Sequence, residues 1–421
     1  MKTIKSSLNK NKLKVFLLHT QNSGVGMWRM LHPAKWINKL GLAEVKMIPF
    51  YWKSHGYPNW ETYVRDCKDK GKEPDPQEFQ KKVEKVPKDP FKEIWDRSRA
   101  NDPRPSLIEK LALWADVIVV MRRDIREHAA LLMALKDLKK PVVLETDDFV
   151  HYVPPYNPGA KYYVPGSEQT DIWSTRQFEL VDAVITTTPG LKKLYTQLHR
   201  KIYLCPNMMD PDYWIDKYPE PKPHPGEIRL GWTGANAHWG DLRVLYDAQD
   251  KSKNVIDVIL NKYPQVNFHF IGQLPEWWYE WKKKGRLVHH RFKTLHYYGE
   301  YLRSVGMDIG IAPLVDNLFN RGKSQIRWNE YSVNKTAVVA SPVLAYSKDA
   351  MGVIKHGKNI FFAKYKEDWI KYLSILIEDE ILRKKMADQA YRDTMKFYNL
   401  EKQAHVWVKV YQQIYDSFHY S

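Results

Sequence analysis

Short apolar runs alternate along the chain with longer amphipathic segments whose apolar residues recur with a helical period. Such runs are typical of strands buried on both faces of a parallel sheet, and the segments between them are typical of covering helices. In the first half, the runs predict strands at 14–19, 117–121, 142–146, 183–187 and 202–207. Helices are expected at 27–40, 125–138 and 173–180. This alternation predicts a parallel sheet with helices on its faces.

The same rhythm returns in the second half of the chain. Strands are expected at 228–232, 266–271, 288–292, 309–312, 337–341 and 359–363. Helices are expected at 254–262, 296–306, 349–355, 367–378 and 380–397. No short internal repeat is evident, which argues against a solenoid. The fold class is therefore α/β, with two doubly wound domains facing each other.

Composition marks the expected domain boundaries. The segment 218–226 carries four prolines, too many for a helix or an interior strand, and is predicted to be a stiff linker. It separates a first domain at 1–217 from a second domain at 227–395. The polar segment at about 52–105 interrupts the first domain and is interpreted as an insertion near a site. The last segment, 396–421, is expected to form a helix that packs back on the first domain.

The charge balance predicts an anionic partner. The 421 residues include 66 Lys and Arg against 49 Asp and Glu, a formal net charge of +17, which suits a nucleotide, a nucleic acid or a membrane surface. The only cysteines, Cys67 and Cys205, lack metal-ligand or redox spacing and fit a reducing compartment. No apolar run approaches the roughly 18 residues of a membrane span, and the lysine-rich start lacks the apolar core of a signal peptide. A cytoplasmic protein without a transmembrane segment is expected, and peripheral membrane association stays open.

An aromatic and basic run at 277–293 has two interpretations. Its tryptophans and lysines could stack bases and follow phosphates, or rest on an anionic membrane. The alternative is a helix and connector of the second domain with a basic outer face. The run by itself does not decide between them.

The segment from Asn320 to Tyr331 places a small, basic turn before a predicted helix and a buried strand. Ser324 is a plausible N-cap, and a free helix N-terminus attracts anions. Lys323 and Arg327, one helical turn apart, would add charge-assisted hydrogen bonds to phosphate. The alternative is a solvated basic helix start.

Several motifs occur in an order that resembles the GT-B glycosyltransferases of the group-1, retaining type. The resemblance covers most of the chain, with the insertion at 52–105 the least covered. The motifs are the Gly-rich turn at 23–29, then 181–188, 203–207 with Asp210, 230–234, 268–272, 307–314 and the segment 320–342. Each motif alone is weak, but this order is fairly specific.

The resemblance implies two Rossmann-like domains with the active site between them. It implies transfer of a sugar from a nucleoside diphosphate donor, expected to be a UDP-sugar, to an acceptor hydroxyl with retention. No cofactor and no metal are expected. By its place before the strand at 337–341, Glu330 matches the second Glu of the family pattern E-x7-E, which binds the ribose hydroxyls. The first Glu of that pattern falls at Gly322, so the identity of the sugar is left open.

The second domain supplies most of the expected donor site. Lys323 is a candidate catalytic residue that, with Arg327 and Ser324 at the helix start, would neutralise the departing diphosphate. The loop ending the strand at 228–232 is expected to approach the phosphates. Its candidates are Gly231, Thr233 and Gly234, followed by the weaker Asn236, His238 and Asp241. Gly272 and Gln273 are expected near the base.

The first domain is expected to close over the donor and bind the acceptor. Gly24, Gly26 and Arg29 would form the opposite wall, although Arg29 could equally make a structural salt bridge. Asp148 and His151 are candidate catalytic residues on the acceptor side, with helix capping or a solvated loop as the alternative. Asp147 and Asp148 would raise each other's pKa if buried. They also suggest a metal site, but no third ligand is near, so none is predicted.

A second function class competes with sugar transfer. The basic, aromatic surface would suit a nucleic-acid-binding protein without transfer activity, in which the α/β domains serve as scaffold. The acceptor of the transferase could be a glycan, a lipid, a protein or a modified DNA base. The oligomeric state is also left open by the sequence.

Overall fold

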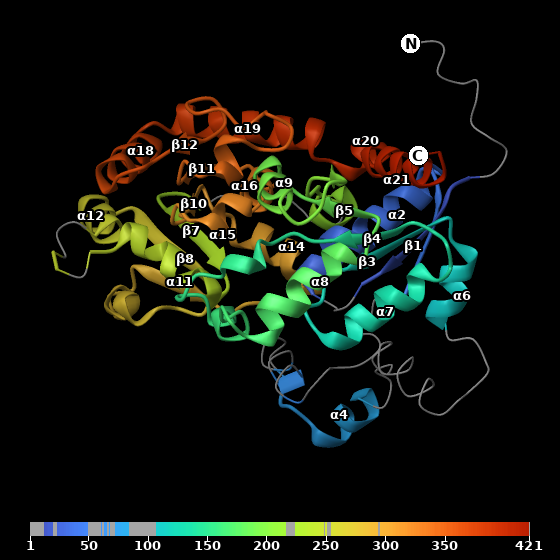
Figure 1. Ribbon diagram of the computed structural model, residues 1–421. Helices are drawn as coiled ribbons and strands as arrows, with labels where there is room; N and C mark the ends of the chain where they lie inside the picture. The colour runs from blue at the N-terminus through green and yellow to red at the C-terminus, as the bar shows by residue number, and fades with distance from the viewer. Residues whose placement is uncertain are drawn as a thin grey trace, which may run out of the picture.

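The computed structural model describes residues 12–19, 23–48, 60, 63–64, 67, 72–83, 107–215, 224–247, 249–250, 254–293 and 295–420. Two parallel six-stranded sheets, each flanked by helices, lie side by side in two lobes (Figure 1). This is the two-domain α/β architecture that the sequence predicts. Most of the insertion at 52–105, and the linker up to residue 223, lie outside the described residues.

The first sheet has the strand order β2-β1-β3-β4-β5-β6, and all its neighbouring strands run parallel. Its strands are β1 (Lys14–Leu18), β2 (Glu44–Met47), β3 (Val117–Met121), β4 (Val142–Glu145), β5 (Ala183–Thr186) and β6 (Ile202–Leu204). The central β3, β4 and β5 are buried along their whole length, as their continuous apolar runs require. The edge strand β2 was not predicted, because its residues alternate between apolar and charged.

The second sheet has the order β12-β11-β10-β7-β8-β9, again with parallel neighbours. Its strands are β7 (Ile228–Gly234), β8 (Val266–Gly272), β9 (Leu287–His290), β10 (Ile309–Ala312), β11 (Ala337–Ala340) and β12 (Phe361–Phe362). Each predicted strand of this half is present, β10 with the predicted bounds and the others with shifted ends. The loop after β1 of the first sheet and the loop after β7 of the second sheet meet at the interface between the lobes.

Helices cover both sheets. In the first lobe they are α1 (Gly24–Gly26), η1 (Met27–Leu31), α2 (His32–Lys39), α4 (Pro76–Val83), α6 (Leu107–Trp114), α7 (Arg126–Lys136), α8 (Ser174–Glu179), α9 (Pro189–Tyr195) and α10 (Pro211–Trp214). In the second lobe they are η6 (Asn236–His238), α11 (Trp239–Leu242), α12 (Val255–Lys262), α13 (Tyr279–Lys283), α14 (Leu295–Val305), α15 (Leu318–Gly322), α16 (Ile326–Ser332), α17 (Leu344–Ser347), α18 (Lys366–Glu378) and α19 (Glu380–Phe397).

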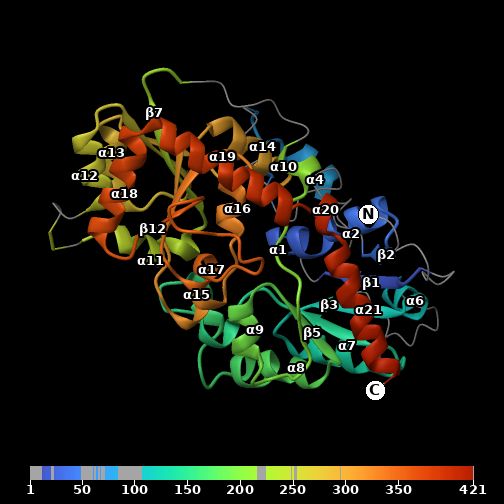
Figure 2. The ribbon, with the colours of Figure 1, turned by 90° about the horizontal axis from the view of Figure 1, so that it is seen from above.

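The last two helices return to the first lobe. After α19, which lies over the second lobe, the chain continues through α20 (Leu400–Gln403) and α21 (His405–His419), which lie over the first lobe in Figures 1 and 2. Trp407 and Tyr411 of α21 are buried in the same apolar cluster as Trp36 and Val119. Burial of these large side chains ties the end of the chain to the first domain.

The predicted helix at 349–355 is wrong. A four-residue helix, α17, lies before it, and the segment itself forms turns. The Asp349 carboxylate accepts hydrogen bonds from the backbone N–H groups of Val353 and Ile354, both at 3.1 Å. Gly352 has a φ of +64°, which a helix does not allow. A side chain that satisfies the backbone in this way competes with helix formation.

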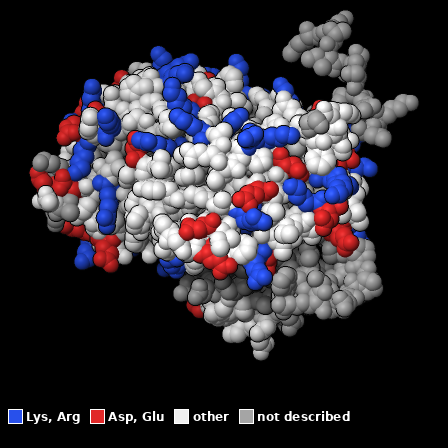
Figure 3. Space-filling view, in the orientation of Figure 1, with Lys and Arg blue, Asp and Glu red and all other residues white. Residues whose placement is uncertain are grey.

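The aromatic and basic run at 277–293 forms η9 (Glu276–Trp278), α13 and β9. Trp278 and Trp281 are 2% and 8% exposed and pack in the core of the second domain. These two rings face inward and cannot stack on bases, whereas Tyr279 is 49% exposed. The run forms a helix and connector of the second domain, and binding of nucleic acid or membrane by its outer face stays a prediction. On the face in Figure 3, basic side chains are scattered over both lobes among acidic ones.

No helix within the described ranges is both long and apolar enough to cross a membrane.

Candidate functional site

The loops after several parallel strands meet between the lobes, the usual location of ligand sites in such sheets. A cavity of about 400 Å³ lies there. Its lining from the first domain includes Gly24, Val25, Trp28, Asp147, Asp148 and Asn207. Its lining from the second domain includes Thr233, Gly234, His238, Tyr298, Lys323, Ser324, Arg327 and Glu330. This cleft brings together most of the polar residues that the sequence selected from both halves.

Lys323 lies in the turn between α15 and α16, and its charge reaches across to the other domain. Its Nζ lies 3.2 Å from Oδ1 of Asp148 and 4.4 Å from the centre of the Phe319 ring. The turn is held in place because the hydroxyl of Thr188, from the first domain, donates to the carbonyl of Gly322 at 3.1 Å. Lys323 and Asp148, which were predicted for the donor and the acceptor side, are therefore in direct contact in the cleft.

Arg327 and Glu330 form an ion pair on α16. Nη1 of Arg327 lies 2.6 Å from Oε2 of Glu330 and 3.0 Å from the hydroxyl of Tyr298. Burial raises the pKa of Glu330, and Arg327 and the Tyr298 hydroxyl partly offset this effect. Within the described residues, the second oxygen of Glu330, Oε1, has no hydrogen-bond partner. That oxygen is available to accept hydrogen bonds from a ligand in the cleft.

The prediction that Ser324 caps a helix is wrong. Helix α16 begins two residues later, with Gln325 at the N-cap position and no side-chain cap. The Ser324 hydroxyl instead accepts from Nδ2 of Asn207 at 2.8 Å, and Nε2 of Gln325 donates to the Asn207 carbonyl at 3.1 Å. These bonds join the α16 start to the strand end of the first domain. Ser324 still lines the cleft, but as part of the domain contact.

Asp147 and Asp148 follow β4 and face the second domain. Burial, together with the neighbouring Asp148 carboxylate, raises the pKa of Asp147 to about 7. A neighbouring carboxylate is expected to act on Asp147 in this direction. The Asp148 carbonyl accepts from the hydroxyl of Tyr195 at 2.7 Å, which fixes the backbone of this pair.

His151 is not in the cleft, contrary to its predicted role. Its Nε2 lies 3.2 Å from the Thr175 hydroxyl and 3.3 Å from that of Ser174. The ring packs among Phe149, Phe178 and Tyr195. Burial lowers the pKa of His151, so it is a neutral, packed histidine of the first domain.

Arg29 is also not a cleft residue, and the salt-bridge alternative is the one the structure shows. It is completely buried, with Nε and Nη2 at 2.8 and 3.0 Å from the two oxygens of Glu145. Nη1 donates to the Cys205 carbonyl, and the guanidinium lies 4.5 Å from the centre of the Trp407 ring. Arg29 therefore links the first sheet to α21, behind the cleft.

The predicted glycines divide into lining and packing positions. Gly24 and Gly234 line the cleft, whereas Gly26, Gly231 and Gly272 do not. A Cβ on Gly231 would lie 2.0 Å from the sulfur of Met307, so this glycine serves packing within the second sheet. Gly272 has a φ of +133°, and a Cβ there would lie 2.2 Å from the Gly234 carbonyl oxygen. Gln273 is exposed and outside the cleft.

Some lining residues were missed by sequence reasoning. Tyr298 of α14 is 4% exposed, and its hydroxyl contacts Thr233, Arg327 and Glu330. Asn207 joins the domains, and Trp28 lines the cleft beside Gly24. Helix α14 is amphipathic, but no sequence signal shows which of its tyrosines meets an acid far along the chain.

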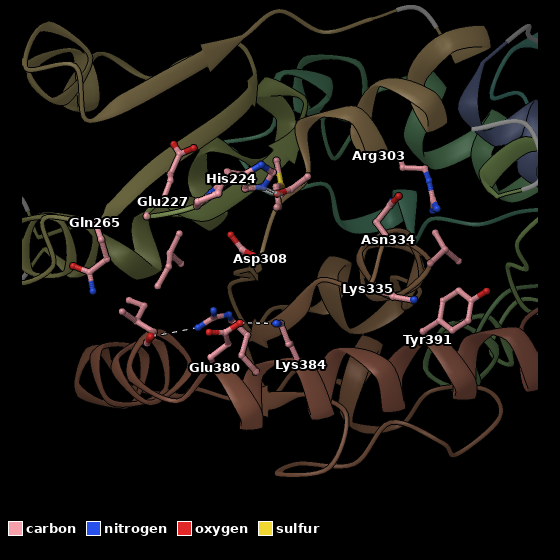
Figure 4. A pocket seen from close by; sticks show the side chains of 18 of the residues that line it. His224, Glu227, Gln265, Arg303, Asp308, Asn334, Lys335, Glu380, Lys384 and Tyr391 are labelled. Carbon is pink, nitrogen blue, oxygen red and sulfur yellow. Dashed lines mark hydrogen bonds and ion pairs between the residues drawn. The ribbon is translucent and has the colours of Figure 1, made fainter. Parts of the chain in front are cut away.

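A larger cavity, of about 780 Å³, lies at the opposite edge of the second sheet (Figure 4). Its lining includes acidic and basic side chains, among them the ion pair of Glu380 and Lys384. None of the predicted site residues lines it. Over the part of the chain that is described, no three His, Cys, Asp or Glu side chains gather as a metal site. Metal independence stays a prediction.

Comparison with known proteins gives a likeness in structure only. No protein-family model and no curated protein sequence matches the chain. Among solved structures, a glycosyltransferase of Rickettsia africae matches with a TM-score of 0.58 at 14% identity, over 96% of this chain and 99% of that one. HepE of Anabaena, in complex with UDP and glucose, matches with a TM-score of 0.54 at 12% identity, over 98% and 100% of the two chains. The sucrose-phosphate synthase of Thermosynechococcus elongatus also matches, with a TM-score of 0.54 at 12% identity, over 96% and 100%.

These likenesses extend over nearly the full length of both partners. Together with the two parallel sheets and the cleft between them, they define the class: the chain has the GT-B fold, two Rossmann-like domains facing across a cleft.

Proposed function

We propose that the chain is a glycosyltransferase that moves a sugar from a UDP-linked donor to an acceptor hydroxyl with retention. The observation that carries the proposal is the cleft, where Lys323, Arg327 and Glu330 of one domain face Asp147 and Asp148 of the other. The structure of HepE contains UDP and glucose within the same fold, which supports the choice of nucleotide. Fold likeness alone does not assign a reaction, so the proposal depends on these side chains.

On the donor side, Glu330 would accept hydrogen bonds from the ribose hydroxyls through Oε1. Lys323 and Arg327 would bind the diphosphate. Breaking the bond between sugar and phosphate places negative charge on the departing oxygen. Fixed cations in a cleft shielded from water stabilise that charge by several kcal/mol.

On the acceptor side, the carboxylates of Asp147 and Asp148 would hydrogen-bond the attacking hydroxyl. A carboxylate whose pKa is raised to about 7 is suited to accept a proton near neutral pH. Lys323 contacts Asp148, so the donor and acceptor groups are coupled through one ion pair. The acceptor itself, whether glycan, lipid, protein or modified DNA base, is not identified by these residues.

Calorimetry with UDP tests the donor site. We expect UDP to bind the wild type, and to bind Glu330→Ala about tenfold or more weakly, because the substitution removes charge-assisted hydrogen bonds. Glu401→Ala, which removes an exposed carboxylate of α20 outside the cleft, is the matched control and should bind UDP as the wild type does. Equal affinity in all three proteins would show that Glu330 does not contact the nucleotide.

A second measurement tests for sugar transfer and for the alternative of a nucleic-acid-binding protein. Intact mass spectrometry of products, from UDP-sugars offered with glycan, lipid, protein and DNA acceptors, should reveal one acceptor gaining a sugar mass. Salt-sensitive binding of duplex DNA without nucleotide binding or sugar transfer would favour the nucleic-acid alternative instead.

A further inference from the structure

The cleft contains more acids than cations. Asp147, Asp148 and Glu330 line it against Lys323 and Arg327. Both cations are already paired, Lys323 with Asp148 at 3.2 Å and Arg327 with Glu330 at 2.6 Å. A diphosphate entering this cleft brings further negative charge, so one more positive charge beside Lys323 and Arg327 would favour its binding.

His238 is the imidazole on the cleft wall. It ends η6, directly after the strand end of β7, and its side chain is 28% exposed. Its Nδ1 lies 2.9 Å from Oδ2 of Asp241. A carboxylate at Nδ1 holds the proton on that nitrogen and leaves Nε2 as the free ring nitrogen. No described residue bonds to Nε2, which is therefore open to a ligand in the cleft.

Asp241 is a rigid support for this imidazole. It is 1% exposed, and its other oxygen, Oδ1, accepts from Nδ2 of Asn320 at 2.7 Å and the backbone N–H of Val315 at 3.1 Å. The third donor is the hydroxyl of Tyr156 at 2.9 Å, from the first domain. Three donors on Oδ1 leave Oδ2 to His238, so the ring orientation is fixed by both domains.

We propose that His238 is a further donor-site residue, which takes up a proton when the diphosphate binds and hydrogen-bonds it through Nε2–H, with Asp241 as its positioning residue. The inference rests on the proposed function, since it names the group that completes the diphosphate subsite. Tyr156 of the first domain bonds Asp241, so contact between the domains helps to hold the His238 ring in place.

The charges around His238 explain the proton uptake. Burial, Lys323 and Arg327 lower the pKa of His238, while Asp241 opposes this shift. A diphosphate between these groups reverses the balance, because the anion favours the imidazolium. Asp147, with its pKa raised to about 7, is the second group that can take up a proton, so the two contributions must be separated.

The experiment is calorimetry of the full chain between about pH 6 and 8, in buffers with different ionisation enthalpies. The probes are UDP, GDP, ADP and inorganic pyrophosphate. For the wild type we expect proton uptake on binding, and an affinity that falls by up to about tenfold per pH unit as pH rises. His238→Gln retains a neutral donor near the Nε2 position but cannot titrate, so its uptake should fall by up to about one proton. Asp147→Asn should retain the proton uptake that is due to His238.

Control variants distinguish a loss of proton uptake from a loss of folding. His419→Gln, at the exposed end of α21, should behave as the wild type. His238→Asn, whose amide can still bond Asp241, is the second test variant in case His238→Gln unfolds, as judged by thermal denaturation. Uptake in a folded His238 variant equal to that of the wild type would overturn this inference while leaving the donor site intact. If no probe binds the wild type, the proposed function fails together with it.

Discussion

Nζ of Lys323 lies 3.2 Å from Oδ1 of Asp148, and this ion pair joins the two domains inside the cleft. The lysine side chain is 18% exposed and the carboxylate 35%. A diphosphate would compete with Asp148 for the lysine. The same contact thus connects the group proposed to bind the donor with the group proposed to bind the acceptor.

Substitutions of Lys323 and of Asp148 should affect UDP binding differently. Lys323→Ala should weaken UDP binding by about tenfold to a hundredfold, the value of a hydrogen bond to a charged group. Asp148→Asn removes the competitor, so UDP should bind as tightly as to the wild type or more tightly, while sugar transfer falls. Calorimetry and a transfer assay measure the two quantities. Equal weakening of UDP binding by both substitutions would mean that the pair only holds the domains together.

Glu330 should distinguish nucleotides by their ribose. If Oε1 accepts from the ribose hydroxyls, the wild type should prefer UDP over 2′-deoxy-UDP by about tenfold, because a buried acceptor would be left unpaired. Glu330→Ala should lose this preference. The ratio of the two dissociation constants is the measurement, and it is insensitive to general weakening by the freed Arg327. An unchanged ratio in the variant would remove Glu330 from the ribose site.

Arg29 should contribute to stability and not to nucleotide binding. Its guanidinium and the Glu145 carboxylate are both at most 1% exposed. Arg29→Met leaves a buried carboxylate without its partner, which should lower the free energy of unfolding by about 3–5 kcal/mol. Urea denaturation measures this loss, and Arg29→Met with Glu145→Met should recover much of it. A folded Arg29→Met protein that cannot bind UDP would restore Arg29 to the donor site.

The fold was predictable because burial of a parallel strand on both faces leaves a continuous apolar run, as in Val117–Met121. The same logic fails for β2, whose alternating pattern is that of an edge strand. It also fails at Asp349, where one carboxylate accepts hydrogen bonds from two backbone N–H groups, so that the predicted helix does not form. Local chemistry overrides periodicity at such positions.

The site was predictable where a short local pattern marks its residues, as in the segment 323–330 or directly after a buried strand at Asp148. Lys323, Arg327 and Glu330 are neighbours in sequence, so their approach in space follows from one short helix and the turn before it. Arg29 and Glu145 are 116 residues apart, and no spacing rule shows that they meet. The His151 ring points toward Phe178 and Tyr195 of its own domain, and these contacts are likewise between residues far apart in sequence.

Tyr156 should hold the cleft closed. Its hydroxyl donates to Asp241 and accepts from Nδ2 of Asn317 at 3.0 Å, so it is one of the contacts that hold the first domain against the second. The ring packs where a Cβ on Gly240 would lie 2.1 Å from its Cγ. Tyr156→Phe keeps the ring and removes the hydrogen bonds, and Gly240→Ala expels the ring. Both should increase the radius of gyration measured by X-ray scattering, with the larger change in Gly240→Ala. Unchanged scattering in both variants would show that other contacts suffice.

Asp147 should set the pH dependence of transfer. Its pKa is raised to about 7, first by burial and then by Asp148, so it is protonated over much of the range from pH 4 to 7, where an ordinary aspartate is ionised. If its carboxylate accepts the proton of the attacking hydroxyl, kcat at saturating donor should rise as pH increases through about 7, because only the ionised form can act. Asp147→Asn should abolish that rise and lower the rate, whereas Asp171→Asn, at an exposed aspartate outside the cleft, should preserve the profile. A rise near pH 7 that persists in Asp147→Asn would assign the titration to another group and leave Asp147 as an uncharged neighbour of the acceptor.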